Sequence, residues 1–87
     1  MRTVYKYEVE LNKYVTIAMP LEAEILHFGL DYEQDLCIWA EVETERDTEA
    51  RVFQIVGTGN EITNSDSFHL GSCVVGPYVW HLYEVPE

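Results

Sequence analysis

Basic residues are scarce in this chain, and they are confined to its first part. Of the 87 residues, 5 are Lys or Arg and 16 are Asp or Glu, so the formal net charge is -11. The segment from Val52 to Glu87 contains neither Lys nor Arg. Because proteins hold phosphate backbones with Lys and Arg, this composition excludes ordinary binding to DNA, RNA or anionic membrane surfaces. The same field favours a basic protein as partner.

Long apolar runs and cysteines are also lacking. No apolar run approaches the ~18 residues that a membrane helix needs, and the start of the chain lacks the apolar stretch and cleavage site of a signal peptide. We therefore expect a soluble protein of the cytoplasm. Cys37 and Cys73 are too few and too far apart for a disulfide framework or a metal knuckle. Both lie in apolar runs, which favours buried free thiols over a disulfide.

Apolar and aromatic residues, in contrast, are plentiful. Residues of hydrophobic type make up 47% of the chain, including six Tyr, two Trp and three Phe. A disordered acidic tail is much poorer in such residues. The sequence therefore predicts one folded domain over residues 1–87, with no linker and no internal repeat.

The hydrophobic periodicity is mostly that of strands. Apolar and polar residues alternate at the start of the chain, where Tyr5, Tyr7, Val9 and Leu11 interleave with Lys6, Glu8, Glu10 and Asn12. Six further strand-like runs, bounded by turn signals, cover Tyr14–Met19, Ala23–Leu30, Leu36–Glu43, Arg51–Val56, Phe68–Val75 and Tyr78–Val85. This pattern predicts an all-β fold, a small antiparallel sandwich or barrel of six to seven strands. The alternative is an α+β fold with one short helix at Leu21–Phe28.

Acidic residues gather in the middle of the chain and form the candidate partner-binding site. Arg46 is the only basic residue in the segment 31–49. The same segment contains eight acidic residues, Asp31, Glu33, Asp35, Glu41, Glu43, Glu45, Asp47 and Glu49. The last five stand at every second position. If Glu41 and Glu43 lie on a strand, their spacing of about 6.7 Å approximates two phosphate steps of a DNA strand. The alternative is the wet face of a half-exposed strand followed by a solvated hairpin loop from Glu45 to Glu49.

Catalytic and metal-binding patterns are not evident. His27, His69 and His81 could combine with a cysteine or a carboxylate, but their spacing supports neither a metal site nor a nucleophilic triad. Gly57-Thr58-Gly59 lacks the Lys-Ser/Thr ending of a phosphate loop and predicts a turn. We expect no enzyme activity, no catalytic residue, no metal and no cofactor.

Several segments together resemble one protein family. They are Tyr5-Lys6-Tyr7-Glu8, Ile17-Ala18-Met19-Pro20, Ala23-Glu24-Ile25-Leu26, Leu36-Cys37-Ile38-Trp39-Ala40, Phe53-Gln54-Ile55-Val56-Gly57-Thr58-Gly59 and Val79-Trp80-His81-Leu82-Tyr83-Glu84. In this order they resemble a family of small proteins encoded by bacteriophages and prophages, to which no molecular role is attached. The resemblance implies a setting, the cytoplasm of a host bacterium. Small acidic proteins in that setting often occupy the nucleic-acid groove of a host protein.

Charge and resemblance together predict a function and one alternative. The predicted function is an acidic, non-enzymatic phage protein that inhibits a host defence or nucleic-acid-handling protein, as anti-CRISPR proteins and DNA mimics do. Its partner would be a host protein with a basic nucleic-acid-binding surface. The alternative is a phage structural or assembly protein, or a homodimer, that associates through aromatic residues. Tyr78–Val85 is apolar on both faces, which fits either a central strand or a strand that pairs with another subunit.

Overall fold

The computed structural model describes residues 1–11 and 14–86, and it confirms the all-β prediction. Seven strands were found there, and no helix among these residues is long and apolar enough to cross a membrane. The strands are β1 (Arg2–Glu8), β2 (Tyr14–Pro20), β3 (Glu24–Leu30), β4 (Leu36–Glu43), β5 (Thr48–Gly57), β6 (Phe68–Val75) and β7 (Tyr78–Val85).

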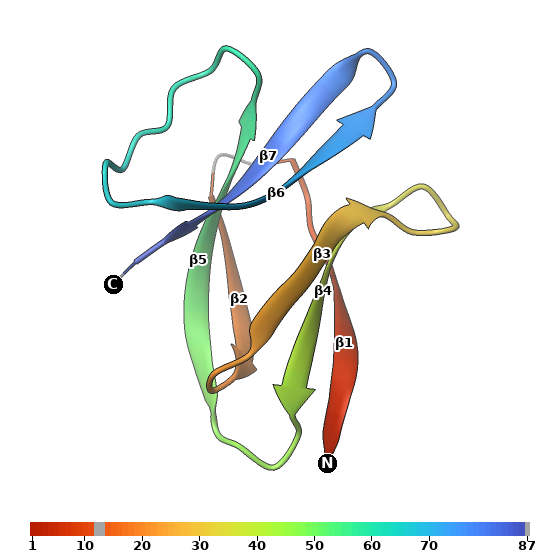
Figure 1. Cartoon of the computed structure of the whole chain (residues 1–87), viewed down its shortest axis with the longest axis vertical. Coiled ribbons are helices and arrows are strands. Elements are labelled where there is room, and N and C mark those ends of the chain that lie inside the picture. The colour runs from red at the N-terminus through yellow and green to blue at the C-terminus, as the bar shows by residue number, and fades with distance from the viewer. Residues whose placement is uncertain (12–13, 87) are drawn as a thin grey trace.

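The strands form two antiparallel sheets, here called sheet A and sheet B. Sheet A has the order β1-β4-β3 and sheet B the order β2-β5-β7-β6. Figure 1 shows the two sheets as separate layers that cross at an angle, with β3 running beside β6. At this crossing, a Cβ built on Gly71 of β6 would lie 3.4 Å from the Cβ of Phe28 on β3. The described residues therefore form a sandwich, and not the barrel that the sequence left open.

The core between the sheets follows from the alternation of side chains along the strands. On β4 the inward positions Leu36, Ile38, Ala40 and Val42 are buried, while the outward positions Trp39, Glu41 and Glu43 are partly exposed. Sheet B contributes the fully buried Met19, Phe53 and Leu82. Because β7 lies between β5 and β6, the interpretation of Tyr78–Val85 as a central strand is confirmed.

An ion pair that is largely buried joins β5 to β7. The Arg51 Nε and Nη2 atoms each lie 2.7 Å from a carboxylate oxygen of Glu84, and Arg51 Nη1 donates to the Ala23 carbonyl at 2.6 Å. The side chains of Arg51 and Glu84 are 14% and 12% exposed. The guanidinium also stands over the Phe53 ring, 5.7 Å from its centroid. The hydrogen bond to Glu84 and the negative charge of that carboxylate raise the pKa of Arg51 above its ordinary value, although burial of the guanidinium acts in the opposite direction.

Two sequence predictions are corrected by these elements. The alternative helix at Leu21–Phe28 is wrong, because Leu21 and Glu22 form a turn, with Glu22 at a φ of 64°, and β3 follows at Glu24. The first strand spans Arg2–Glu8 and does not continue through Leu11, which is exposed. Asn12, at the end of that predicted strand, lies outside the described residues.

The prediction that the two cysteines form no disulfide is confirmed. Cys37 and Cys73 are both free, with Cys37 buried and Cys73 half-buried. They lie in different sheets, on β4 and β6. Burial is the main reason that the pKa of the Cys37 thiol is raised, with the neighbouring Asp31 carboxylate adding to it.

Candidate functional site

The loop between β3 and β4 is constructed around the side chain of Asp31. Its Oδ1 accepts hydrogen bonds from the backbone N–H groups of Glu33, at 2.9 Å, and Asp35, at 3.0 Å. The loop closes through a further bond from Asp31 N to the Asp35 carbonyl, at 2.9 Å. Aspartate commonly stabilises turns by accepting such bonds from the following residues. The loop is therefore held in one conformation by its own first residue.

The second carboxylate oxygen of Asp31 joins this loop to the strands beside it. Asp31 Oδ2 accepts from Lys6 Nζ at 2.9 Å, and Cys37 Sγ lies 3.7 Å away. The Asp31 side chain is only 7% exposed. The Lys6 ammonium and the two backbone N–H groups lower the pKa of Asp31 to about 2. Although the sequence named Asp31 as partner-binding, this carboxylate is occupied inside the fold.

The remaining acidic residues around the loop form what we call the tip cluster, which consists of Glu8, Glu33 and Asp35. Glu8 lies close enough to Asp35 that the negative charge of Asp35 raises the pKa of the Glu8 carboxyl, with a hydrogen bond between the two groups adding to the shift. Glu33 and Asp35 are exposed, and Tyr32 between Asp31 and Glu33 is 88% exposed. The only cation at this end within the described residues is Lys6, which is bound to Asp31.

The row of alternate acidic residues starts at the opposite end of sheet A. Glu41 and Glu43 share the outer face of β4, as the sequence spacing predicts for a strand. Each has a cationic partner: the Arg2 guanidinium bonds Glu41 at 2.8 and 3.1 Å, and the terminal amine of Met1 bonds Glu43. These hydrogen bonds are the main reason that the pKa values of both carboxyls are lowered. Their charges are therefore largely compensated within the chain.

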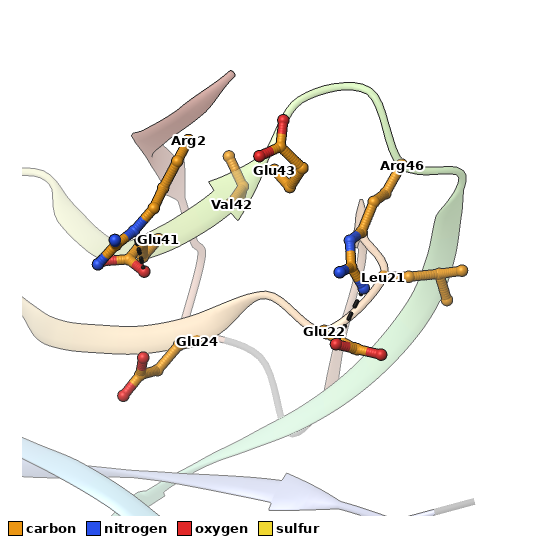
Figure 2. A pocket seen from close by; sticks show the side chains of 8 residues that line it. All are labelled: Arg2, Leu21, Glu22, Glu24, Glu41, Val42, Glu43 and Arg46. Atoms are coloured by element: carbon orange, nitrogen blue, oxygen red, sulfur yellow. Dashed lines mark hydrogen bonds and ion pairs between the residues drawn. The ribbon is translucent and has the colours of Figure 1, made fainter.

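Figure 2 shows the shallow hollow beside this pair, with a volume of about 240 Å³. Glu24 lies directly opposite Glu41 in the register of β3 and β4, a like-charge pair that the sheet geometry makes unfavourable. The Arg2 guanidinium attracts the carboxylates of both Glu24 and Glu41, but it forms a hydrogen bond with Glu41 alone. On the other side of the hollow Arg46 bonds Glu22 at 2.9 Å. Positively and negatively charged side chains therefore line the hollow together, and it does not present a single row of anions.

The other members of the row leave the strand altogether. Glu45 and Asp47 lie in the β4–β5 loop, and Glu49 lies on β5, opposite Met19 in sheet B. Only Glu41 and Glu43 therefore keep the spacing of about 6.7 Å that would imitate phosphates. β4 is eight residues long, so about 23 Å of strand separate this end from the tip cluster. Figure 1 shows the two loops at opposite ends of β4.

Residues 1–87 match the family described as Domain of unknown function (DUF7352). The chain belongs to this family. No curated protein and no solved structure matches it. The family description of DUF7352 gives no molecular role, and the resemblance to phage proteins stays a prediction.

A second polar group in this DUF7352 chain was not predicted from the sequence. On the outer face of sheet B the Ser72 hydroxyl lies 2.7 Å from His81 Nδ1 and 3.0 Å from His69 Nε2. The far nitrogen of His81, Nε2, lies 2.8 Å from the Thr58 hydroxyl. The sequence pointed to both histidines but gave no sign that Ser72 and Thr58 are their partners, because the four residues meet only when β6, β7 and the turn after β5 come together.

The chemistry available to this histidine network is limited. Two imidazoles and two hydroxyls can pass hydrogen bonds along a chain, but among the described residues no carboxylate forms a hydrogen bond with either ring to orient it as in a catalytic triad. Within the described part of the DUF7352 chain, no group of three or more His, Cys, Asp or Glu side chains is arranged to hold a metal ion. The tip cluster is therefore the better candidate for function.

Proposed function

We propose that this protein is a non-enzymatic binding protein whose tip cluster docks onto a basic, nucleic-acid-binding surface of a host protein and inhibits it. The observation that carries the proposal is the gathering of the exposed carboxylates of Glu8, Glu33 and Asp35 at one end of sheet A, where the negative charge of Asp35 raises the pKa of Glu8. Like charges held together in this way are unfavourable unless a cation comes between them. An arginine or lysine of a partner would supply that cation.

The chemistry of the tip fits such a partner. Arginine binds carboxylates in the same bidentate way as it binds phosphates, so a groove that holds nucleic acid also accepts a cluster of carboxylates. The described basic side chains cannot serve this purpose within the chain. Lys6, Arg46 and Arg51 are bound to carboxylates of their own, as is Arg2.

Tyr32 adds an anchor to the charged surface. Tyrosine is enriched among the residues that dominate binding energy, and an aromatic ring exposed to this degree buries much apolar area on contact. The hydrogen bonds of Asp31 hold the loop that carries it. Since the loop is ordered before binding, little conformational entropy is lost when a partner is engaged.

A second candidate function is self-association through sheet B. Its edge strand β6 and the start of β7 carry three exposed apolar side chains, Phe68, Val74 and Tyr78. An exposed edge strand offers backbone groups for pairing with another chain. This candidate corresponds to the structural or homodimeric role and predicts association that salt does not weaken.

The test is affinity capture from bacterial lysate at low and high salt, with three forms of the protein as bait. They are the wild type, a tip variant (Glu33→Lys with Asp35→Lys) and a control with the same change of charge at the other end (Glu45→Lys with Asp47→Lys). We expect the wild type and the control, but not the tip variant, to retain a nucleic-acid-binding protein that salt releases.

The captured protein, identified by mass spectrometry, is then tested for competition. A DNA or RNA oligonucleotide that it binds should displace the wild-type bait. Capture that is equal for the tip variant, or complexes that nucleic acid leaves intact, would contradict the proposal. Recovery of the bait alone as a salt-resistant oligomer would support the second candidate.

A further inference from the structure

We propose that the cleft beside the β6–β7 turn is a binding site for a neutral ring that carries hydroxyl groups, such as a pyranose sugar. The cleft has a volume of about 460 Å³ and is lined by Gly57, Thr58, Asn60, Pro77, Tyr78, Val79 and Trp80. Its lining residues belong to two segments, the end of β5 with the turn after it and the β6–β7 turn with the start of β7, which Figure 1 shows at the same end of sheet B. Its residues belong to sheet B, so the inference does not depend on the function proposed for the tip cluster of sheet A.

Two aromatic rings form the apolar part of the cleft. The ring centroids of Tyr78 and Trp80 are 6.0 Å apart and their planes differ by 34°. Tyr78 is 63% exposed, so its ring is largely in contact with water in the free protein. The faces of such rings bind apolar surface, and the C–H face of a pyranose is a flat apolar surface of matching size. The separation of the centroids is too small for a ligand to lie between the rings, which places it on top of them.

Gly57 provides the space in which the cleft forms. A Cβ built at this position would lie 2.9 Å from Asn60 Nδ2 and 3.1 Å from Trp80 Cζ3, closer than ordinary contact. Its φ angle lies outside the left-handed region, so the backbone itself does not require glycine here. The absence of a side chain instead allows the Asn60 amide and the Trp80 ring to meet over the strand.

The cleft also contains unused hydrogen-bonding groups. The backbone N–H of Asn60 bonds the Gly57 carbonyl at 2.9 Å, which holds the residue in the turn. Its side-chain amide has no hydrogen bond to any other residue that the structure describes. An amide offers two donors and one acceptor, a set that suits the hydroxyls of a sugar, which both donate and accept. Ring faces with a few directed polar groups are typical of small-molecule sites.

Charge decides the class of ligand. None of the seven lining residues is charged, and no Lys or Arg occurs from Val52 onwards, so a phosphate or carboxylate would find no partner and would be repelled by the net charge of -11. A cation would be removed from water without a carboxylate in the lining to replace its hydration. A neutral ligand that combines an apolar face with hydroxyls meets neither cost.

The proposal is tested by nuclear magnetic resonance of the ¹⁵N-labelled full chain during titration with methyl glycosides and trisaccharides of glucose and of N-acetylglucosamine. We expect at least one saccharide to shift the backbone signals of residues 57–60 and 77–80. Tyr78→Ala and Asn60→Ala should each weaken its binding roughly tenfold, because each removes one direct contact. Gly57→Ala should abolish binding by occupying the space beside Trp80.

Tyr5→Ala is the matched control, since it removes an exposed tyrosine from β1 of the other sheet, and it should leave the titration unchanged. Sodium phosphate and tetramethylammonium are titrated as charged probes. The proposal is overturned if no saccharide shifts these signals, if the shifts lie outside the cleft, or if either charged probe binds there more tightly than every saccharide. Loss of folding in Gly57→Ala would not affect the result, because the exposed Tyr78 and Asn60 variants report independently.

Discussion

Lys6 of β1 and Asp31 at the end of β3 meet across sheet A, with the ammonium nitrogen 2.9 Å from Asp31 Oδ2. This pair uses the one described cation at the tip for the carboxylate that holds the loop together. Among the residues that the structure describes, Glu8, Glu33 and Asp35 are thereby left without an ion pair of their own. The uncompensated negative charge of the tip cluster therefore depends on the Lys6–Asp31 ion pair as well as on the number of carboxylates.

Replacing Asp31 with Asn should destabilise the fold at neutral pH and have no effect in strong acid. The folded-state pKa of Asp31 is about 2, below the ordinary value of 3.8. An acid with a depressed pKa stabilises the folded state above the ordinary value, and that stability is lost as the pH falls through the folded value. Urea unfolding of both proteins between about pH 7 and pH 2 measures the difference, with Glu33→Gln as the exposed control. Equal midpoints at neutral pH would contradict this role.

Replacing Glu8 with Gln should stabilise the folded protein at neutral pH while weakening its binding to a basic partner. The pKa of Glu8 is raised in the folded state, so folding disfavours its ionised form, and the wild type loses stability as the pH rises through the ordinary value of 4.5 and the raised value. The variant has no charge to lose, so its advantage should appear above that range and vanish in acid. Thermal unfolding across this range, with Glu10→Gln as control, measures the first effect.

The binding effect of Glu8→Gln is measured by the salt-dependent capture described above. A cationic partner favours the ionised carboxylate, so capture by the wild type should increase with pH across the same range. If Glu8→Gln is more stable than the wild type but binds the partner equally well, the repulsion between Glu8 and Asp35 has no part in binding. In that case the contact between Glu8 and Asp35 would be only a feature of the fold.

Local patterns predicted the strands well where their ends are marked in the sequence. The bounds of β4, β6 and β7 agree with the prediction residue for residue, because polar loops or Gly76-Pro77 flank them. The predicted bounds of β1 were wrong because the alternation of apolar and polar residues continues through Leu11, whereas the pairing with β4 ends at Glu8, opposite Cys37. Pairing is a property of two segments, and the alternation of one segment cannot give it.

The candidate site was predictable in composition but not in arrangement. The carboxylates from Asp31 to Glu49 are evident in the sequence, yet their partners come from far along the chain: Arg2 for Glu41 and Lys6 for Asp31. Glu8 reaches Asp35 only because β1 lies beside β4. Which carboxylates are compensated is therefore decided by the register of the sheet, which moves the proposed surface from the alternate row to the tip.

Removing one partner of the Arg51–Glu84 pair should be far more costly than removing a partner of a surface pair. Both side chains are almost buried, so Glu84→Gln would leave the guanidinium without its counter-charge, at a cost of about 3–5 kcal/mol. The double variant Arg51→Met with Glu84→Met should recover much of this loss. The Arg46–Glu22 pair, 46% and 80% exposed, is the control, for which we expect less than about 1 kcal/mol. Denaturant unfolding of Glu84→Gln, of the double variant and of the control Glu22→Gln gives both values, and similar costs for the two pairs would contradict the assignment.

Ser72→Ala should release one histidine of the network and leave the other fixed. Ser72 is the one hydrogen-bond partner of the His69 ring among the described residues, whereas His81 also contacts Thr58 at 2.8 Å. A hydrogen bond selects which ring nitrogen carries the proton, so removing it allows a neutral imidazole to populate both tautomers. The ¹⁵N signals of the rings at about pH 8 should show mixed tautomers for His69 and one tautomer for His81. In Ser72→Ala with Thr58→Ala both rings should become mixed, and a single tautomer of His69 in Ser72→Ala would contradict the network.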